Sequence, residues 1–548
     1  MPARHGGGVA FVRVGAMDDN VQNFQAYTAE GVEPGILISV TVVPDVEDRQ
    51  TFNLAPRFDE RAFGLLAAIA GGAGIERDDQ TPAVLADQVQ LYDRLVHDPC
   101  EPTEAPSADA LTAVALAMTS GNHVEPEKST DIPAVMTYFG QFLAHDMTNL
   151  QWSQGKGAWV NERAGHSLNF DTVLAPPDPA CVPHGPWDCT AGVCLGETTR
   201  QDDFRDLPRK TQPQGKACVS DKRNDSNLAL AQMHVLLTRF HHSVQRHNPT
   251  MPMDKVRALT VKHLQAVVFF DYLRTIADEG VWQDVHDNGR SLVRKDITKG
   301  FFVPIEFAAA AFRFGHSMVR DIYSTWGDED QFMYPDTFLR FVHDPPNLQS
   351  DLTEGRLGSM WAHDWRRFSR LAGDDRMIRA ARIDLNIAYA FRDLASGHFA
   401  QKTPPQPGAT LNLARHTLER HYKLRLPSGQ VLAQLAGVQV MSESEVLGTG
   451  YADIALAATQ AGFCTAAPLW YYILREAEHF HDGRRLGPLG SRIVCETLHA
   501  AIENSADSIL KDMGDPAPVF DFTPTMPRVT TGGLFSIEDV IALAYPTP

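Results

Sequence analysis

Hydrophobic residues recur at helical spacing over much of the chain, and polar residues interrupt them at a few positions. In the stretch YFGQFLAHDM, apolar side chains occupy most of the helix circumference, whereas Gln141 and His145 stand four residues apart on one face. Asp131 and Pro133 are typical of a helix start, so the pattern predicts a helix over residues 131–150. A helix that is apolar over most of its surface is buried, so we expect its polar pair to face an internal site.

The same periodicity predicts further helices. One begins after Ser226, whose hydroxyl suits an N-cap, and another spans residues 304–323. The N-terminal part mixes a β-branched run, GILISVTVV, with alanine-rich segments, which indicates a strand or two followed by short helices. We therefore predict a mainly α fold with few short strands, in which residues 1–125 form an extension packed on a large domain of residues 126–548. Other helices are expected over residues 377–393, 410–423, 469–481 and 493–513.

Composition places the chain among ordinary globular proteins. Of its 548 residues, 43% are hydrophobic and 21% are charged, which is ample material for a large core. A formal net charge of -19 argues against a nucleic-acid surface and favours a small ligand or substrate. No apolar segment of signal-peptide length precedes Asp18, and no apolar run approaches a membrane span. We therefore expect a cytoplasmic protein, unless a leader has been removed.

The seven cysteines are too few and too odd in number for a disulfide framework. A disulfide or a metal clip is compatible with the cluster that four of them form around His184, but the spacing matches no strong zinc pattern. We interpret this stretch as an irregular surface loop. The four residues are Cys181, Cys189, Cys194 and Cys218.

Two further segments carry polar groups of interest. AFRFGHSMVRD places His316 on a stripe of small and apolar residues behind four alanines, and such a flat surface suits close approach of a planar ligand. Small residues on a helix indicate close helix packing at least as readily. Arg223 precedes a helix start between Asp221 and Asp225, so it is either a salt-bridged surface group or a fixed positive charge beside His145.

In order and spacing, five segments together resemble the animal-type haem peroxidases of the peroxidase-cyclooxygenase superfamily, most closely its bacterial members: YFGQFLAHDM, RNDSNLALAQMHVLLTRFHH, AFRFGHSMVRD, LPSGQ and PLWYYILREAEHFHDGRRLGPLGSRIV. The resemblance covers residues 131–510 and implies a helical catalytic domain around a buried haem b. By position it implies that His316 is the axial ligand of the haem iron and His145 the distal histidine. Gln141 is then its neighbour in the peroxide pocket, and Arg223 is the distal arginine.

The chemistry of these residue types agrees with those roles. Heterolytic cleavage of hydrogen peroxide needs a base that takes a proton from one oxygen and returns it to the departing one, and an unligated histidine can do both. A cation beside it stabilises the developing hydroxide. The resemblance thus implies a peroxidase, associated with the response to oxidative stress, that uses hydrogen peroxide to oxidise a small reductant, phenolic or halide.

Two rival functions stay open. An oxygenase of the same superfamily, acting on a lipid or another organic substrate, needs a radical tyrosine near the haem. The segment MWAHDWRRF, where we look for that tyrosine, has tryptophans and His363 instead. The second rival is a haem-binding protein whose activity has decayed.

The chain departs from the family at positions that bear on how the haem is held. Two carboxylate positions that form ester links in mammalian relatives are Ala144 and Ser226 here, so we expect haem to be bound without a covalent link. Thr417 stands where the family has an asparagine that accepts the axial histidine's N–H, and its hydroxyl can still accept that bond. Asn412 would accept the axial histidine's N–H in place of Thr417 only if the helix were shifted. Arg420 keeps the place of an arginine that binds a haem propionate.

The resemblance also implies a calcium site. Asp146 holds the family's ligand position after the distal histidine, and SLNFD supplies Ser167, Asn169 and Asp171 where the oxygen ligands of the loop belong. Asn169 replaces an aspartate, and Gly165 stands about where a threonine ligand would be. Because one ligand charge is lost, we expect weakened binding of Ca²⁺.

Overall fold

A computed structural model defines the architecture of the chain, which divides into two units, Met1–Asp87 and Gln88–Pro548. The second unit thus begins well before the boundary that the sequence suggested near residue 125. The structure describes residues 3–5, 8–14, 22–28, 40–44, 50–52, 90–91, 94–96, 105–123, 129–153, 158–161, 166–177, 188–198, 205–209, 217–293, 301–320, 323–326, 331–333, 357, 362–392, 412–512 and 534–546.

The described part of the first unit is an antiparallel sheet in which each strand pairs with the next in sequence. Its fourth strand overlaps the C-terminal part of the β-branched run that predicted a strand, because β-branched side chains suit a pleated surface. The strands are β1 (Ala3–His5), β2 (Gly8–Val14), β3 (Gln22–Thr28), β4 (Val40–Pro44) and β5 (Gln50–Phe52).

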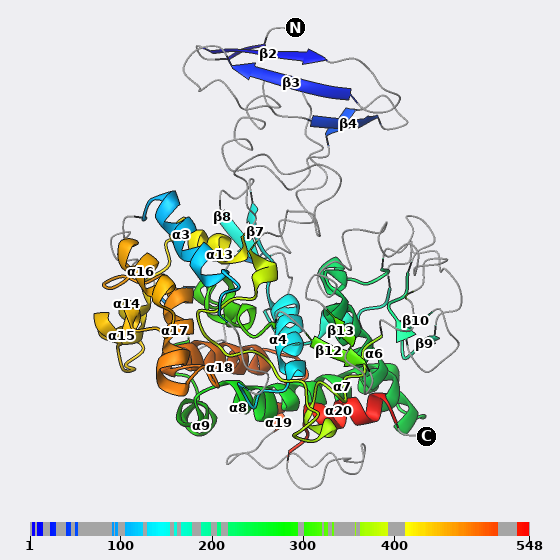
Figure 1. Cartoon of the computed structure of the whole chain (residues 1–548). Helices are drawn as coiled ribbons and strands as arrows, with labels where there is room; N and C mark the ends of the chain where they lie inside the picture. The colour runs from blue at the N-terminus through cyan, green and yellow to red at the C-terminus, as the bar shows by residue number, and fades with distance from the viewer. Residues whose placement is uncertain are drawn as a thin grey trace. The chain divides into compact units, whose positions relative to one another are not determined.

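The second unit is mainly helical, as predicted, with short strands at its margins (Figure 1). The α-helices are α3 (Ala108–Met118), α4 (Ala134–Met147), α5 (Asp171–Leu174), α6 (Leu228–His247), α7 (Met253–Val267), α8 (Leu273–Ile276), α9 (Glu279–Asn288), α10 (Ile305–Ala309), α13 (Leu413–Lys423), α14 (Gly429–Leu435), α15 (Glu443–Leu447), α16 (Ala452–Gln460), α17 (Leu469–His481), α18 (Pro488–Glu503), α19 (Ile509–Asp512) and α20 (Ile537–Ala544). Other turns are the 3-10 helices η1 (Lys222–Asp225), η3 (Ala311–His316), η6 (Arg370–Ala372) and η7 (Tyr389–Phe391) and the π-helix η2 (Val268–Tyr272).

Short strands of the second unit form three small sheets. Leu150 begins a strand rather than ending the predicted helix before it. One sheet contains β6 (Gln90–Leu91), β8 (Ala158–Asn161) and β7 (Leu150–Ser153), another contains β11 (Arg205–Asp206), β10 (Val193–Glu197) and β9 (Asp188–Thr190), and the third contains β12 (Tyr323–Trp326) and β13 (Gln331–Met333).

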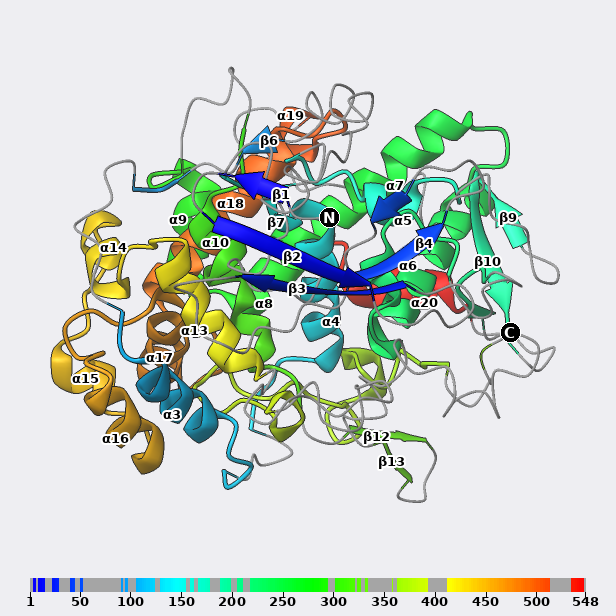
Figure 2. The same ribbon diagram turned by 90° about the horizontal axis from the view of Figure 1, so that it is seen from above.

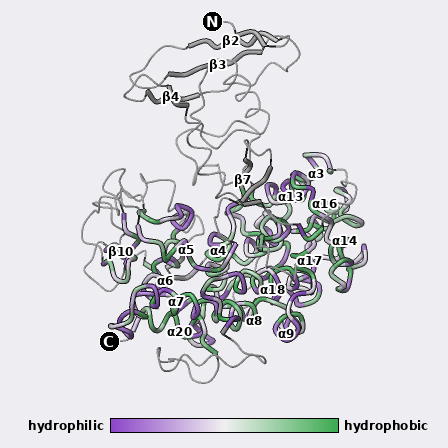
Figure 3. The backbone as a smooth tube through the Cα atoms, turned by 180° about the vertical axis from the view of Figure 1, so that it is seen from behind, coloured by the Kyte–Doolittle hydropathy of each residue, from purple (hydrophilic) through white to green (hydrophobic). Residues whose placement is uncertain are grey.

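Helix α4 occupies the middle of the second unit. It lies between α6 on one side and α13 and α17 on the other, as Figures 1 and 2 both show, and it contacts α6, η1 and η3. Hydrophobic and hydrophilic stretches alternate along the surrounding helices (Figure 3), which place their apolar faces in one continuous core. Gly140 lets the buried Tyr272 side chain approach α4, because a Cβ atom there would collide with the Tyr272 hydroxyl.

Two predicted helix starts are shifted by a few residues. The helix after Pro133 begins at Ala134, with Pro133 as its N-cap, and the exposed Asp131 does not cap it. In the next long helix Asn227, not Ser226, is the N-cap, because its side chain accepts a hydrogen bond from the backbone N–H of Leu230. The predicted helix over residues 469–481 is confirmed in full by α17.

Three predicted helices are wrong in extent. The one over residues 304–323 breaks at Ala310, where φ is -135°, and the chain continues as the 3-10 helix η3. The one over residues 377–393 is irregular in its described part, apart from η7. The one over residues 493–513 begins earlier and is divided into α18 and α19. In the segment 377–393, backbone N–H groups such as those of Ala380 and Ile387 donate to carbonyls of distant segments, so they are not available for helical bonds.

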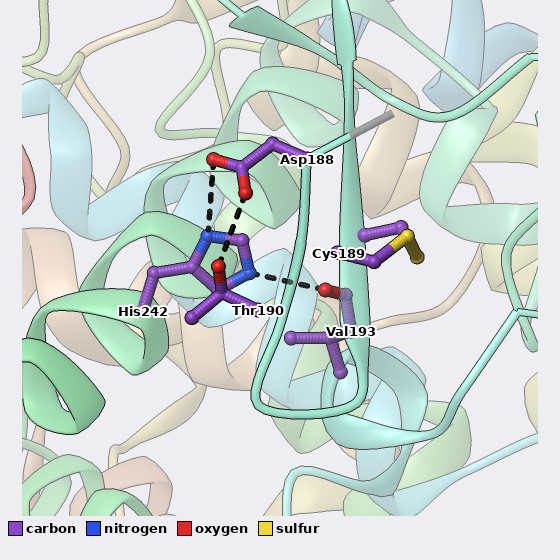
Figure 4. The surroundings of a disulfide bond; sticks show 6 residues. Asp188, Cys189, Thr190, Val193 and His242 are labelled. Carbon is purple, nitrogen blue, oxygen red and sulfur yellow. Dashed lines mark hydrogen bonds and ion pairs between the residues drawn. A yellow bond between two sulfur atoms is a disulfide. The ribbon is translucent and has the colours of Figure 1, made fainter. Parts of the chain in front are cut away.

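The cysteine cluster contains disulfides, so the irregular-loop interpretation was wrong for its described part. Cys189 and Cys194 are joined across the β9–β10 hairpin (Figure 4), and Cys218 is also in a disulfide. The hairpin docks on α6, where the His242 Nε2–H donates to the Val193 carbonyl at 3.1 Å and His241 contacts the Ala191 carbonyl at 3.2 Å. Cys181 and His184 lie outside the described residues.

Within the described part of the chain, no helix has the length and apolar character that crossing a membrane requires.

Candidate active site

The distal-histidine candidate, His145, is held in one tautomer. Its Nδ1 atom lies 3.2 Å from Oδ1 of the buried Asn224. The Nδ2 of Asn224 donates to the Thr172 carbonyl at 3.4 Å, which fixes the amide orientation, since a carbonyl can only accept. The His145 proton therefore sits on Nδ1, and Nε2 keeps its lone pair. Sequence reasoning missed Asn224, although it stands next to Arg223 in the RND motif.

The environment also keeps His145 uncharged. Burial is the main cause that lowers the pKa of His145 to about 4, and the Arg223 charge lowers it further, while Asp221 and the Asn224 hydrogen bond oppose both. At neutral pH the ring is therefore a neutral base. A neutral imidazole with a free Nε2 is the form that can accept a proton from a substrate.

The structure brings Arg223 to the C-terminal end of α4, beside His145. Its guanidinium donates to the carbonyl oxygens of His145 at 2.8 Å and Thr148 at 2.7 Å. It also pairs with Asp221, with an Nη2–Oδ2 distance of 2.6 Å. Both interpretations of this arginine are therefore met at once: it is salt-bridged, and it places a fixed charge next to the histidine. The Asp221 carboxylate partly offsets that charge.

Gln141 lies one helical turn before His145 on the same face of α4. Its Oε1 accepts a hydrogen bond from Asn227 Nδ2 at 3.3 Å. This contact joins the polar face of α4 to the N-cap of α6, so both polar groups of α4 are tied to the RND segment and the residues that follow it.

The axial-ligand candidate, His316, ends η3, which contacts both α4 and α17. Its ring lies edge-on to Trp470, with 6.1 Å between ring centroids. Burial, followed by the charges of Arg313 and Arg420, holds the pKa of His316 well below its usual 6.5. The imidazole is therefore neutral, which is the form that ligates a metal.

Two arginines suit the acidic groups of the implied haem. Arg313 and Arg420 both act on His316, and guanidinium groups are good partners for carboxylates such as propionates. Arg313 also lowers the pKa of His145, so one cation reaches both histidines. Sequence reasoning missed Arg313, although it stands three residues before His316. The neutral imidazole and the flanking cations are the residue types that would ligate a haem iron and pair with its propionates.

The predicted support of the axial histidine is not formed. Nδ1 of His316 is buried and has no hydrogen-bond partner among the described residues. The Thr417 hydroxyl donates instead to the Leu413 carbonyl, at 2.9 Å. Asn412 cannot replace it, because its Oδ1 caps α13 through Arg415 N and its Nδ2 donates to Thr119.

The predicted calcium ligands do not gather into an ion site. Both carboxylate oxygens of Asp146 accept hydrogen bonds from the loop that begins at Phe170. Asp171 pairs with Arg257, Asn169 accepts from Ser505, and Ser167 bonds to Asn504. No group of three or more histidine, cysteine, aspartate or glutamate residues with metal-binding geometry occurs among the residues that the structure describes. The residues therefore do not fit a calcium ion as they stand.

A cavity of about 450 Å³ lies apart from this site. It is lined by residues that precede α4 and by the η2–α9 segment, including Ile132, Phe270, Arg274 and Trp282. None of its lining residues is one of the predicted site residues.

One family model matches part of the chain. Residues 195–357, which include Arg223 and His316, match the family model described as animal haem peroxidase. No curated protein sequence matches the chain.

Several solved structures share the fold at low sequence identity. Peroxidase A of Dictyostelium discoideum is 13% identical with a TM-score of 0.53, and the match covers 80% of this chain and 92% of that one. The fatty acid alpha-dioxygenase of Arabidopsis thaliana is 11% identical with a TM-score of 0.53, covering 84% and 85%. That of Oryza sativa is 12% identical with a TM-score of 0.55, covering 84% and 81%. At these sequence identities the comparisons show a shared fold and nothing more.

Proposed function

We propose that this chain belongs to the peroxidase-cyclooxygenase superfamily and is a haem-dependent peroxidase that uses hydrogen peroxide to oxidise a small phenolic or halide donor. One observation carries the proposal: the unprotonated Nε2 of a neutral His145 lies on a helix that contacts the segment of a second neutral histidine, His316. One Arg313 charge acts on both rings. A neutral base and a neutral, ligating imidazole on two segments in contact are the groups that peroxide cleavage at a metal needs.

The residues of the chain have separate parts in this reaction. His145 Nε2 accepts the first proton of hydrogen peroxide and returns it to the departing oxygen, so that one water leaves. Asn224 keeps the other ring nitrogen protonated throughout. Arg223 adds positive charge where hydroxide develops, and Gln141 offers its amide to the same face. A haem held by His316 would supply the electrons that reduce hydrogen peroxide and would carry the resulting oxidising equivalents to the donor.

Peroxide-dependent oxidation of guaiacol by the purified, haem-loaded protein tests the proposal. We expect turnover that requires both peroxide and haem and that is lost in His145→Ala. The matched control is His479→Ala, since His479 pairs with Glu445 on the surface of α17. Haem-loaded protein that oxidises neither guaiacol nor iodide would favour the decayed haem-binding protein.

An oxygenase is the second candidate, because the alpha-dioxygenases share the fold to the same degree as the peroxidase. The described structure also contains a buried tyrosine pair, Tyr138 on α4 and Tyr323, with ring centroids 6.2 Å apart. One rice enzyme structure contains palmitic acid, so palmitate is the probe. Oxygen uptake with palmitate that exceeds guaiacol turnover would replace the peroxidase proposal with this one.

The pH profile of the peroxide reaction follows from the lowered pKa of His145. A base must be neutral to act, and with a pKa of about 4 the ring stays neutral down to mildly acidic pH. We expect the second-order rate constant with hydrogen peroxide to be flat from pH 8 to about 5 and to fall below that, with a midpoint near pH 4. Stopped-flow measurement across this range checks it, and a midpoint at 6.5 would contradict it.

Haem is held without a covalent link in this proposal. Ala144 has no functional group, and the Ser226 hydroxyl cannot form the ester that a carboxylate makes. Acidified organic solvent is therefore expected to extract unmodified haem and to leave a polypeptide of the apoprotein mass. A haem adduct that stays on the denatured chain after cycling with peroxide would contradict this prediction.

The disulfides suggest where the protein works. Cross-links such as Cys189–Cys194 persist in oxidising compartments and are rare in the cytosol. In place of the expected cytoplasmic location, we propose an oxidising compartment.

A further inference from the structure

Helix α5 connects the two supports of His145. Thr172 donates to Asp146 Oδ1 through its backbone N–H at 3.0 Å and its hydroxyl at 2.9 Å. The Thr172 carbonyl accepts a hydrogen bond from Asn224, which in turn holds the His145 ring. The same short helix therefore fixes the residue that follows the histidine and the residue that sets its tautomer.

The entry to α5 is strained, so other contacts must hold it. Phe170 has a φ of 56°, in the left-handed region that residues with a Cβ atom rarely adopt. Its backbone N–H donates to Asp146 Oδ2 at 2.9 Å, and its buried ring stacks on Phe142 of α4 with 6.3 Å between centroids. The position of α5 is thus tied to the face of α4 that carries Phe142 and Asp146, next to the face of the distal pair.

Arg257 of α7 holds α5 from its other side. Its Nη2 lies 2.6 Å from Asp171 Oδ1, and its Nη1 donates to the Leu174 carbonyl at 2.5 Å, so one guanidinium bridges the first and last residues of the helix. Beside it, Asn169 Oδ1 accepts a hydrogen bond from Ser505 at 2.6 Å. The Asp171 and Arg257 side chains are 47% and 34% exposed, so the pair itself adds little stability, and its main effect is geometric.

We propose that Arg257 is a positioning residue for His145, and that its guanidinium supplies at α5 the positive charge for which a divalent cation was expected. The oxygens of Asp146, Asp171 and Asn169 named above all accept bonds from protein donors. An ion would have to displace those donors, and arginine keeps its charge at every working pH. The distal histidine is therefore held without calcium. Only the description of His145 as the base rests on the proposed function.

The first arm of the test uses the full-length apoprotein and needs no enzymatic activity. After dialysis against EDTA, and again with 1 mM (roughly physiological) CaCl₂, we expect the melting temperature to change by less than about 1 °C, because a ligand that does not bind the native state cannot stabilise it. Elemental analysis is expected to find no stoichiometric calcium. A melting temperature that falls on chelation and recovers with calcium would overturn the proposal.

The second arm compares Arg257→Gln with Lys255→Gln, an exposed residue of the same helix that loses the same charge. Cyanide association with the haem-loaded protein reports on the distal base, since hydrogen cyanide must give up its proton. In Arg257→Gln we expect association to be about three- to tenfold slower, with its pH midpoint moved from near 4 toward 6.5 as His145 loses its fixed environment. Arg257→Lys is expected to restore part of the cyanide association rate and to move the pH midpoint part of the way back toward 4.

The outcomes separate this proposal from the peroxidase proposal. If Arg257→Gln shares the pH midpoint of Lys255→Gln, the positioning role is refuted. If Arg257→Gln yields no folded protein, Asp171→Asn removes the same ion pair, and a midpoint unchanged from the parent chain refutes the role equally. A protein whose melting temperature is unaffected by calcium and chelator, but which oxidises neither guaiacol nor iodide, would refute the peroxidase and leave the cation-free support of α5 intact.

Discussion

Replacing His316 with alanine is expected to leave a protein that folds but retains little haem and lacks the absorption of histidine-ligated iron. The ring is neutral and is flanked by Arg313 and Arg420, and its removal takes away the only iron ligand that we assign. Apolar burial and carboxylate–arginine contacts would then hold the haem alone. Haem content per polypeptide and the Soret spectrum after gel filtration measure the effect.

A matched control keeps this result specific. His421 is also buried and also has a lowered pKa, but its Nδ1 accepts a hydrogen bond from Leu469 N, so it has a structural partner. His421→Gln is expected to keep haem at the parent level or to lose it only with the fold. Unchanged haem occupancy and spectrum in His316→Ala would show that another residue ligates the iron.

Replacing His145 with alanine is expected to keep haem but to slow the reaction with hydrogen peroxide by about 10²- to 10⁴-fold, the usual contribution of a positioned acid-base group. The ring contacts Asn224 and is not assigned as an iron ligand, so the haem spectrum should change little. Stopped-flow mixing with peroxide gives the rate constant.

His145→Gln separates base chemistry from packing. An amide at this position can still bond to Asn224, but it cannot take a proton at neutral pH. We expect it to be as slow as His145→Ala. A glutamine variant that reacts at the parent rate would mean that the base is another group.

Local sequence determined those elements whose stabilising contacts lie within one segment. α17 matches its predicted bounds because apolar periodicity and the preceding proline act within one segment. α4 was predicted for the same reason, and the face that carries Gln141 and His145 follows from helical geometry alone. The hydrogen bond from the Thr417 hydroxyl to the Leu413 carbonyl also follows from local sequence, since a threonine inside a helix tends to bond to the carbonyl four residues earlier.

Contacts between distant segments decided the rest. Four alanines before His316 favour a continuous helix, but the chain breaks at Ala310, and the Arg313 carbonyl accepts a hydrogen bond from Trp470, 157 residues away. Only the folded chain shows that bond.

The sequence by itself determined the mainly helical fold and the absence of the two ester-forming carboxylates, and it proposed the two histidines. Only the tertiary structure decided what those residues bind. The carboxylate oxygens of Asp146 and Asp171 can bind either a metal ion or hydrogen-bond donors of the protein. The sequence does not show which of these groups lies within bonding distance in the folded chain. Folding brings Arg257 to Asp171 from 86 residues away and Asn224 to His145 from 79 residues away. Hydrogen-bond partners follow proximity in space, whereas periodicity and motifs follow proximity along the chain.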